Sequence, residues 1–510
     1  MSTDSDEIRT YKGQERALRA DRLGTPGLLL SVLAASAPLM VVAGVMPTTY
    51  GVMGIVGQPL LFLILGAVLV LFSFGYAEMS RHVHNAGAFY AYIARGLGPT
   101  AGAGAAFVAL IAYSTLQVGI YGMFGFEVSS LFATYLDTEL AWWIPALAAV
   151  ALVGVLAWLK IDLNAKVLGV LLVIEVALVV VFDFAAVADP AKEGLSLHAF
   201  NPSTLSGAGI GTALCFCIAA FTGFEQAPVY AEETSRPHLV VSRVMFLAVG
   251  FSAVFFAFSS WALNVAAGPD GIVDAARKNG PGLLFGLTED RLGGTFTDVL
   301  HGLFVTGMFA ALLSFHNVVA RYVFAMGREG LLPAAFGRTN HTSGAPGSGS
   351  LLQTVISFVV VVAFAVADDK PTGDPTAAVL HLFTWMGNVG ALGVIVLMAA
   401  ASFAVIAFFV RRGAAGAQLW RLLASGVAGV ALLVIAFYTV KDFDVLVGAG
   451  PDSSLSWLLP SIIALALAGG VAYGLVVRAV RPEAHARIGQ GNEAFRLEKA
   501  ARGSDERARI

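Results

Sequence analysis

The chain has 510 residues, of which 57% are hydrophobic and only 13% are charged, and its formal net charge is -3. Apolar runs of about 20 residues recur along the sequence, which is the length that crosses a hydrocarbon core roughly 30 Å thick. This composition excludes a soluble globular protein and a nucleic-acid-binding protein. It predicts an all-α polytopic protein of the lipid bilayer.

The amino-terminal stretch, residues 1–26, is polar and contains both acidic and basic residues. No apolar stretch of the kind found in cleavable leaders stands ahead of the first long apolar run, so a signal peptide is not expected. We predict a cytosolic N-terminal tail.

Twelve apolar segments follow, separated by polar breaks or by breaks that contain Gly and Pro. They lie near residues 27–50, 57–79, 99–133, 140–160, 163–187, 207–230, 239–267, 296–327, 351–367, 377–410, 418–440 and 455–478. An even number of spans places both termini on one side of the membrane. Residues 479–510 are expected to form a polar cytosolic C-terminal tail.

The positions of Lys and Arg test this number of spans, because basic residues accumulate in cytosolic segments. If both termini are cytosolic, 25 of the 31 Lys and Arg residues fall on the inside and 6 on the outside. A missed span would scramble this alternation. The distribution therefore favours twelve spans with cytosolic termini.

The sixth apolar segment is interrupted. The stretch AFTGFEQAPVYAEETSRP, residues 220–237, contains Gly223, Glu225 and Pro228. Glu225 lies roughly 10 Å below the inner edge of the membrane, at about 1.5 Å per residue, and so close to its middle. Gly weakens a helix and Pro is best tolerated in a first helical turn. One half-helix is therefore expected to end near Phe221 and another to begin near Glu225.

The first segment is interrupted in the same way. Within AASAPLMVVAG, Ser36, Ala37 and Pro38 lie about 15 Å into the membrane. Interruptions in the first and sixth spans indicate two inverted repeats of five spans, whose broken helices present backbone groups to a substrate. The alternative is that these Gly and Pro residues only kink ordinary membrane helices.

Three segments carry a resemblance to a known family. They are NAGAFYAYIARGLGP (85–99), GFEQAPVYAEETSRP (223–237) and ARYVFAMGREGLLP (320–333). They resemble the second-to-third-helix, sixth-helix and eighth-helix segments of the amino acid-polyamine-organocation (APC) superfamily, in the right order and at the right spans. The resemblance covers the chain from about residue 27 to about residue 480.

This resemblance implies a leucine-transporter-type transport core of ten helices in residues 27–410 and two peripheral helices in residues 418–478. It also implies secondary transport of an amino acid, a polyamine or a related organic cation, driven by a proton or by exchange. In amino acid carriers of the family, N–H groups at the first break bind the substrate carboxylate, and carbonyls at the sixth-helix break receive its amine. The substrate-binding residues expected at the two breaks are Ala35, Ser36, Ala37, Pro38, Phe221, Thr222, Gly223, Phe224 and Glu225.

The first break departs from the family, which has a Gly-rich triplet where this chain has Ser36, Ala37 and Pro38. Ser36 is expected to cap the second half-helix, with Pro38 in its first turn. Side chains at this break would narrow the approach of a carboxylate, which leaves the substrate class open.

Glu175 lies in the middle of the fifth segment, KVLGVLLVIEVALVVV. By spacing it resembles the position at which some proton-coupled relatives carry a Lys in place of a sodium ion. A carboxylic acid within the membrane can bind and release a proton, so Glu175 is the candidate proton-coupling residue. The alternative is a structural hydrogen bond to a neighbouring helix. Sodium coupling would require two hydroxyls on the eighth segment beside the first break, where only Ser314 is found. Proton coupling or exchange is therefore favoured.

Polar side chains on two further segments complete the candidate site. Tyr113, Gln117 and Tyr121 share one face of the third segment. We expect Tyr113 and Gln117 to contact the substrate, with interhelical hydrogen bonding as the alternative. On the eighth segment, Asn317 and Arg321 lie one turn apart and form a candidate cytosolic gate with Ser314, unless Arg321 only extends towards the membrane surface.

These observations predict a multi-pass carrier of the plasma membrane for a small molecule: an amino acid, an amine or a polyamine. The alternatives are a carrier of a nucleobase or an inorganic cation on the same fold, and a membrane sensor that does not transport. An enzyme is not expected, because no catalytic cluster occurs at one membrane face. Neither a metal nor a cofactor is expected, since Cys215 and Cys217 point to different faces of one segment.

Overall fold

The computed structural model describes residues 24–83, 85–159, 165–206, 209–234, 237–340, 345–368, 375–413, 416–448 and 453–491. The greater parts of the two predicted tails, residues 1–23 and 492–510, lie outside the described residues.

The described chain is helical throughout. Its α-helices are α2 (Thr25–Ser36), α3 (Pro38–Met40), α4 (Met46–Gly51), α5 (Gln58–Ser80), α6 (Ala88–Leu97), α7 (Pro99–Leu136), α8 (Trp143–Leu159), α9 (Ala165–Ala188), α10 (Ile210–Phe221), α11 (Pro237–Ala267), α12 (Ile272–Asn279), α13 (Gly282–Leu292), α14 (Gly294–Glu329), α15 (Gly347–Ala367), α16 (Thr384–Arg411), α17 (Leu419–Lys441), α18 (Phe443–Val447), α19 (Leu455–Val480) and α20 (Pro482–Arg487). Short π-helices are η1 (Val41–Val45) and η6 (Ala378–Phe383), and 3₁₀ segments are η2 (His198–Phe200), η3 (Pro202–Leu205), η4 (Phe224–Glu233), η5 (Ala334–Gly337) and η7 (Gly416–Gln418).

Glycine and proline set the ends of several long helices. The corner between α6 and α7 is Gly98, whose φ of 107° disfavours other residues, and Pro99 begins α7. Gly330, with a φ of 88°, ends α14. These signals are visible in the sequence, which explains why the helix positions could be predicted.

Ten helical stretches in the described residues are long and apolar enough to cross a membrane. An eleventh is counted if α10 and the start of η4, which bend by 42° at their junction, form one span. α8 is apolar but has only 17 residues. Each predicted span coincides with one helix or with a run of consecutive helical segments, and the all-α class is confirmed, while the number twelve stays a prediction.

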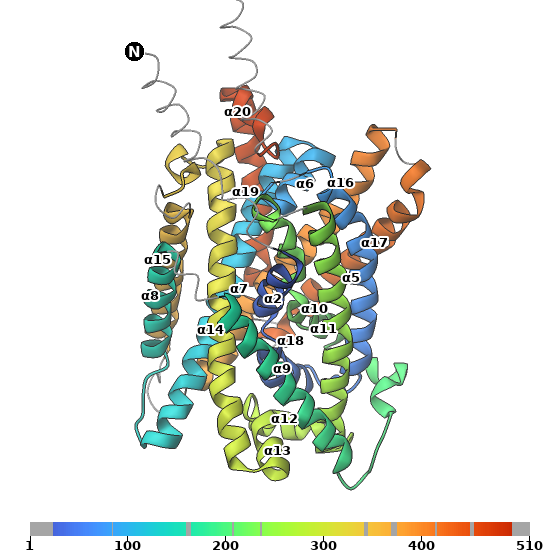
Figure 1. The fold of residues 1–510 in the computed structure, drawn as a ribbon, viewed down its shortest axis with the longest axis vertical. Helices are drawn as coiled ribbons and strands as arrows, with labels where there is room; N and C mark the ends of the chain where they lie inside the picture. Colours follow the sequence, from blue (N-terminus) through green and yellow to red (C-terminus); the bar gives the residue numbers. More distant parts are fainter. Residues whose placement is uncertain are drawn as a thin grey trace, which may run out of the picture.

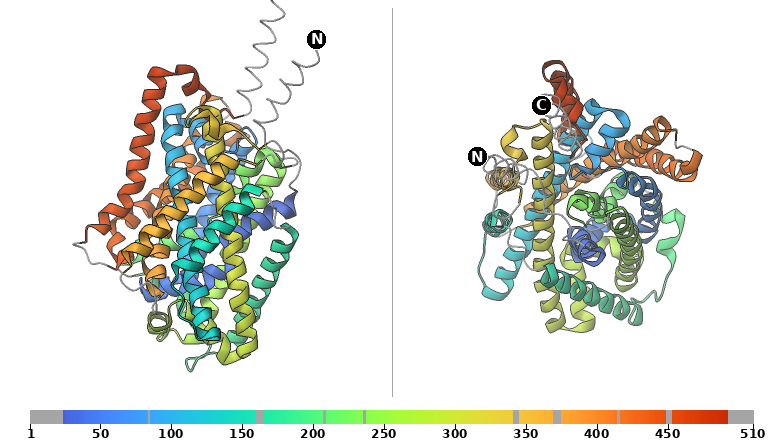
Figure 2. Two further views of the ribbon diagram at one scale, coloured as in Figure 1. Left: turned by 90° about the vertical axis from the view of Figure 1, so that its left-hand side faces the viewer. Right: turned by 45° about the horizontal axis from the view of Figure 1, so that its top comes forward.

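The long helices run side by side, with α2 and α10 near the middle of the bundle (Figure 1). α7 and α14 are the longest, at 38 and 36 residues, and they pack against each other. α7 also packs against α15 and α16, and α14 packs against α2 and α15. α8 and α15 form a pair on one flank (Figure 1), and α19 lies on the outside of the bundle against α7 (Figure 2). The interrupted helices are thus enclosed by continuous ones.

The end of the molecule opposite α20 is covered by α12 and α13 (Figure 1). Arg277 of α12 donates its Nε hydrogen to the carbonyl oxygen of Gly51 at 2.9 Å, and so holds the end of α4. Arg291 of α13 donates to the carbonyl oxygen of Ala266 in α11, also at 2.9 Å. These two bonds fasten the cover to the ends of two spans.

The segment after α20 is bound to the end of α14. The Glu329 carboxylate, which is buried, accepts the backbone N–H of Gly489 at 2.7 Å and that of Gly491 at 2.9 Å. Asn85 donates its amide N–H to the same carboxylate at 2.7 Å. Both glycines have positive φ, 80° and 54°, so the segment folds back in a shape that side chains would disfavour.

Candidate functional site

The first interruption is a single left-handed residue between α2 and α3. Ala37 has a φ of 42° and donates its N–H to the Ala34 carbonyl at 3.3 Å, and Pro38 begins α3. The expectation that Ser36 caps the second half-helix is wrong: its hydroxyl donates to the Leu33 carbonyl at 2.8 Å, within its own helix. Ser36 is still part of α2, so its hydroxyl bonds to a carbonyl of that helix and does not reach the start of the next one.

A carboxylate from another helix meets the start of the second half-helix. Leu39 donates its N–H to Oε1 of Glu175 in α9 at 2.7 Å. Glu175 is 2% exposed, and its other oxygen lies against Gly307 of α14, where a Cβ would come within 2.5 Å of it. An acidic group is favourable there because the N–H groups of a helix start carry partial positive charge.

A small cavity, with room for about one water molecule, lies beside this contact. Its lining comes from α2, α9, α14 and the interruption itself: Ala34, Ala37, Leu171, Leu172, Glu175, Thr306, Gly307 and Ala310. The expected first, fifth and eighth spans therefore converge on Glu175.

The second interruption separates α10, which ends at Phe221, from η4, which begins at Phe224. Gly223 has a φ of 131°, and a Cβ on it would lie 2.6 Å from the Val32 carbonyl oxygen of α2. Only glycine fits this conformation and this close approach. The two interruptions are therefore in direct backbone contact.

Glu225 joins the second interruption to α7. Its side chain is fully buried; Oε2 accepts the N–H of Gly223 and Oε1 accepts the hydroxyl hydrogen of Tyr113, each at 2.9 Å. The carboxylate can reach back to Gly223 because the left-handed turn there directs the N–H towards the start of η4. The structure thus brings Tyr113, Gly223 and Glu225 together.

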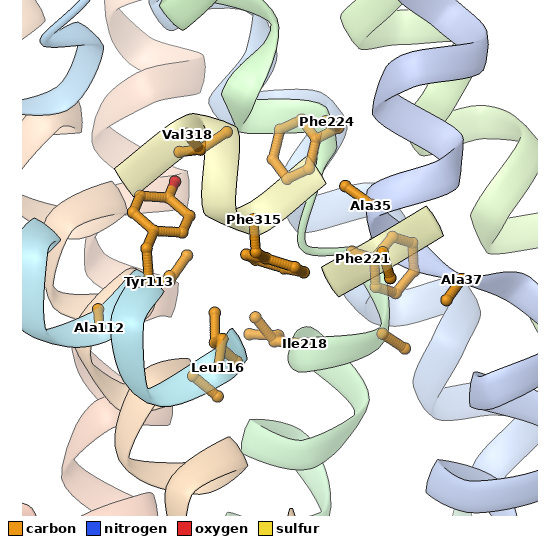
Figure 3. Packing of buried hydrophobic residues seen from close by; sticks show 14 of the residues in the cluster. Ala35, Ala37, Ala112, Tyr113, Leu116, Ile218, Phe221, Phe224, Phe315 and Val318 are labelled. Atoms are coloured by element: carbon orange, nitrogen blue, oxygen red, sulfur yellow. The ribbon is translucent and has the colours of Figure 1, made fainter. Parts of the chain in front are cut away.

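Aromatic rings pack around Tyr113 and Phe224. The Tyr113 ring centroid lies 5.4 Å from that of Tyr322 and 6.2 Å from that of Phe315, both in α14. Phe224 meets the edge of Phe72 at 6.0 Å. Figure 3 shows Phe315 between Tyr113 and Phe221, with Phe224, Ala35 and Ala37 close by.

Three of these aromatic residues were missed by sequence reasoning: Phe72, Phe315 and Tyr322. Phe315 and Tyr322 are seven residues apart in α14, a spacing that places them on one helix face. That spacing was the available signal.

Two of the expected substrate-binding residues have other contacts. Phe221 packs against Phe62, with ring centroids 6.1 Å apart, and against Phe256, at 6.0 Å. Thr222 donates its hydroxyl hydrogen to the Ala219 carbonyl at 2.6 Å.

Gln117 is hydrogen-bonded to two other helices. Its amide nitrogen donates to the Leu312 carbonyl at 3.0 Å, and its oxygen accepts from Gln353 of α15 at 2.7 Å. Gln353 in turn accepts the hydroxyl hydrogen of Ser114 at 2.8 Å. These buried bonds tie α7 to α14 and α15, which is the interhelical role that the sequence left as the alternative.

Comparison with known proteins identifies the family. The sequence model described as amino acid permease matches residues 29–472. The chain belongs to this family. The APC superfamily, predicted from three sequence segments, is thereby confirmed, and the chain is an integral membrane protein.

Two relatives illustrate the similarity. The chain is 25% identical over 338 residues to the branched-chain amino acid permease BcaP of Lactococcus lactis subsp. cremoris. The matched region covers 60% of this chain and 68% of that relative. It is 24% identical over 280 residues to the low-affinity putrescine importer PlaP of Escherichia coli, covering 53% of this chain and 59% of the importer. The match with the importer thus spans less than two thirds of that protein.

The three candidate gate residues of this permease lie along α14. Ser314 donates its hydroxyl to the Ser31 carbonyl of α2 at 3.5 Å. Arg321 donates to the Asn317 carbonyl at 3.1 Å, and its guanidinium lies 4.6 Å from the centre of the Tyr230 ring in η4. Both half-helices, α2 and η4, therefore contact this part of α14.

Two buried acidic residues of the permease were also missed. Asp183 of α9 accepts the hydroxyl hydrogen of Ser259 at 2.7 Å. Glu127 of α7 lies 2.5 Å from Nδ1 of His301 in α14, and the His301 ring stacks on Phe285 of α13 at 3.7 Å. An acidic residue inside an apolar run was the signal in each case.

Proposed function

We propose that the chain is a secondary active transporter of the plasma membrane that moves an amino acid or a related amine or polyamine by alternating access. The proposal includes twelve spans, built as two inverted repeats of five with two peripheral helices, and cytosolic termini. Membership of the permease family supports a transporter rather than an enzyme. The names of the two relatives, a branched-chain amino acid permease and a putrescine importer, support these substrate classes.

The observation that carries the proposal is the contact between the two interruptions. Gly223 touches the backbone of α2, and each interruption holds a buried carboxylate, Glu175 or Glu225, through a backbone N–H. Broken helices and acidic side chains are both costly in a membrane, and they are found where a solute or an ion is bound. Their meeting at one place supports a substrate site there.

We assign proton coupling to Glu175. Its carboxyl group links α9 to the start of α3 and lies against α14, so a movement of the first span relative to the other two would change its surroundings. Burial favours the neutral form of a carboxyl group, and an N–H donor favours the ionised form. Separation from Leu39 would therefore shift the balance towards a bound proton.

We assign the cytosolic gate to the contacts of α14 with the two half-helices. Arg321 lies over Tyr230 and Ser314 bonds to Ser31, so opening towards the cytosol would break one contact to η4 and one to α2. Such closing contacts commonly limit the rate of a transport cycle.

The test is uptake of labelled leucine and labelled putrescine into vesicles that contain the purified chain. The variant Gly223→Leu should abolish uptake, because even its Cβ would collide with the Val32 carbonyl. Gly250→Leu in α11 is the matched control, since a Cβ there meets nothing within 4 Å, and it should keep uptake.

Two results would contradict the proposal. Unchanged uptake in Gly223→Leu would show that the interruption is not needed for transport. If no amino acid or amine crosses with the folded wild-type chain, the carrier proposal fails and a membrane sensor becomes the better interpretation.

A further inference from the structure

At the first interruption, the backbone N–H groups of residues 37–39 are not available to an anion. A substrate carboxylate would need backbone N–H groups at the start of the second half-helix. The N–H of Ala37 is bonded to Ala34, Pro38 has no N–H, and the N–H of Leu39 is bonded to Glu175. A carboxylate of the chain itself therefore stands where a substrate carboxylate would bind.

The second interruption repeats this arrangement. The N–H of Gly223 is bonded to Glu225, so this position too already carries an acidic group of the chain. An incoming carboxylate would have to displace two acidic side chains of the chain from the N–H groups that they occupy.

A cation would find several favourable partners at the same place. Glu225 provides a buried carboxylate that is bonded to Tyr113, and the rings of Tyr322 and Phe315 pack against the Tyr113 ring. Aromatic faces attract ammonium groups, most strongly where both are removed from water. α10 also ends here, and the carbonyl end of a helix favours positive charge.

In the described chain, Gln226, the residue after Glu225, and Tyr76 have unpaired polar atoms that a ligand would complete. Both polar atoms of the Gln226 amide are buried without a hydrogen-bond partner among the described residues. The Tyr76 hydroxyl is also buried without a hydrogen-bond partner among the described residues. The Tyr76 ring stacks on Phe72 at 4.8 Å between ring centroids, and Phe72 contacts Phe224. Buried polar groups are rarely left without partners, and an ammonium group would supply a donor to the Gln226 amide oxygen or to the Tyr76 oxygen.

We propose that the substrate carries an ammonium group and no carboxylate, with Glu225 as its counter-ion and Tyr113 as the residue that positions Glu225. This inference rests on the proposed transport function and narrows its substrate class to organic amines. Glu175 is assigned to the coupled proton in this scheme and is not a substrate ligand.

The experiment compares amino acids with the amines that differ from them only by loss of the carboxylate. The pairs are leucine with 3-methylbutylamine and ornithine with putrescine. Binding to the purified full chain is measured by the rise in melting temperature with ligand concentration, and uptake is measured in vesicles after subtracting protein-free vesicles. The amine of at least one pair should bind and cross, and its amino acid should do neither.

Variants test the assigned counter-ion. Glu225→Gln keeps the shape and an acceptor for Gly223 but removes the charge, and it should weaken amine binding by about 10- to 100-fold, the usual effect of losing a charged hydrogen-bond partner. Tyr113→Phe should weaken binding less and leave the amine selectivity in place. Glu127→Gln, which alters a buried glutamate paired with His301, is the control and should bind like the wild type.

The outcomes separate the two proposals. If the amino acids bind and cross while the amines do not, transport stands and the inference about substrate class is overturned. Amine binding that is unchanged in Glu225→Gln overturns the role of Glu225. If neither member of any pair binds or crosses, the proposed transport function itself has failed.

Discussion

The two interruptions differ in where their carboxylates come from. At the first, Glu175 reaches Leu39 from a helix 136 residues away in sequence; at the second, Glu225 reaches Gly223 from two residues further along the same chain. The first contact therefore depends on how α9 packs against the start of α3, and the second moves with its own half-helix.

This difference suggests different tasks for the two acidic residues. A contact within one short segment can hold its shape while helices shift, which suits substrate binding. A contact between two helices is made or broken when they move, which suits coupling to a proton. Each of the two carboxylates can be replaced separately, so the two tasks can be tested one at a time.

The variant Glu175→Gln is expected to have the largest effect, because it should remove proton coupling and leave substrate binding in place. The Gln side chain can still accept the N–H of Leu39, so the fold should persist, but it cannot take up a proton at neutral pH. Uptake driven by an imposed pH gradient should fall to the level without a gradient, while substrate binding and exchange remain. Gradient-driven uptake equal to that of the wild type would exclude Glu175 as the coupling residue.

An intermediate effect is expected from Gly307→Ala. Its Cβ would lie 2.5 Å from Oε2 of Glu175, so the carboxyl group or α14 must move, at a cost of about 1–3 kcal/mol. The melting temperature and the gradient-driven uptake should both fall. Gly302→Ala in the same helix meets nothing within 4 Å and should be neutral or slightly stabilising. If the two variants have the same melting temperature and the same gradient-driven uptake, the contact between Gly307 and Glu175 is not tight.

The smallest effect is expected from Ala37→Gly, which gives the first interruption the residue type of the second. Glycine would relieve a left-handed conformation that costs an alanine roughly 1 kcal/mol, and it would lose one buried methyl group worth a similar amount. The melting temperature of the purified protein should therefore change by only a few degrees. A large loss would show that the Ala37 methyl group fills a space that the fold requires.

The positions of the helices could be predicted because their signals are local. Apolar length marked each span, and Gly223 and Pro38 marked the interruptions. Contacts between helices could not be predicted, because they depend on which faces meet after packing. The partner of Leu39 is one example, and Gln353 as the partner of Gln117 is another. The error at Ser36 has the same origin, since its hydroxyl had two backbone groups within reach and the extent of α2 decided between them.

The attachment of Gly489 and Gly491 to Glu329 has a practical consequence for handling the protein. A truncation after Arg487 would remove the two backbone N–H donors, Gly489 and Gly491, of a buried carboxylate at the end of α14. The same helix carries Phe315 and Tyr322. A buried acceptor that loses its donors weakens the fold around it. Affinity tags and protease sites therefore belong beyond Gly491, where they leave this anchor of α14 intact.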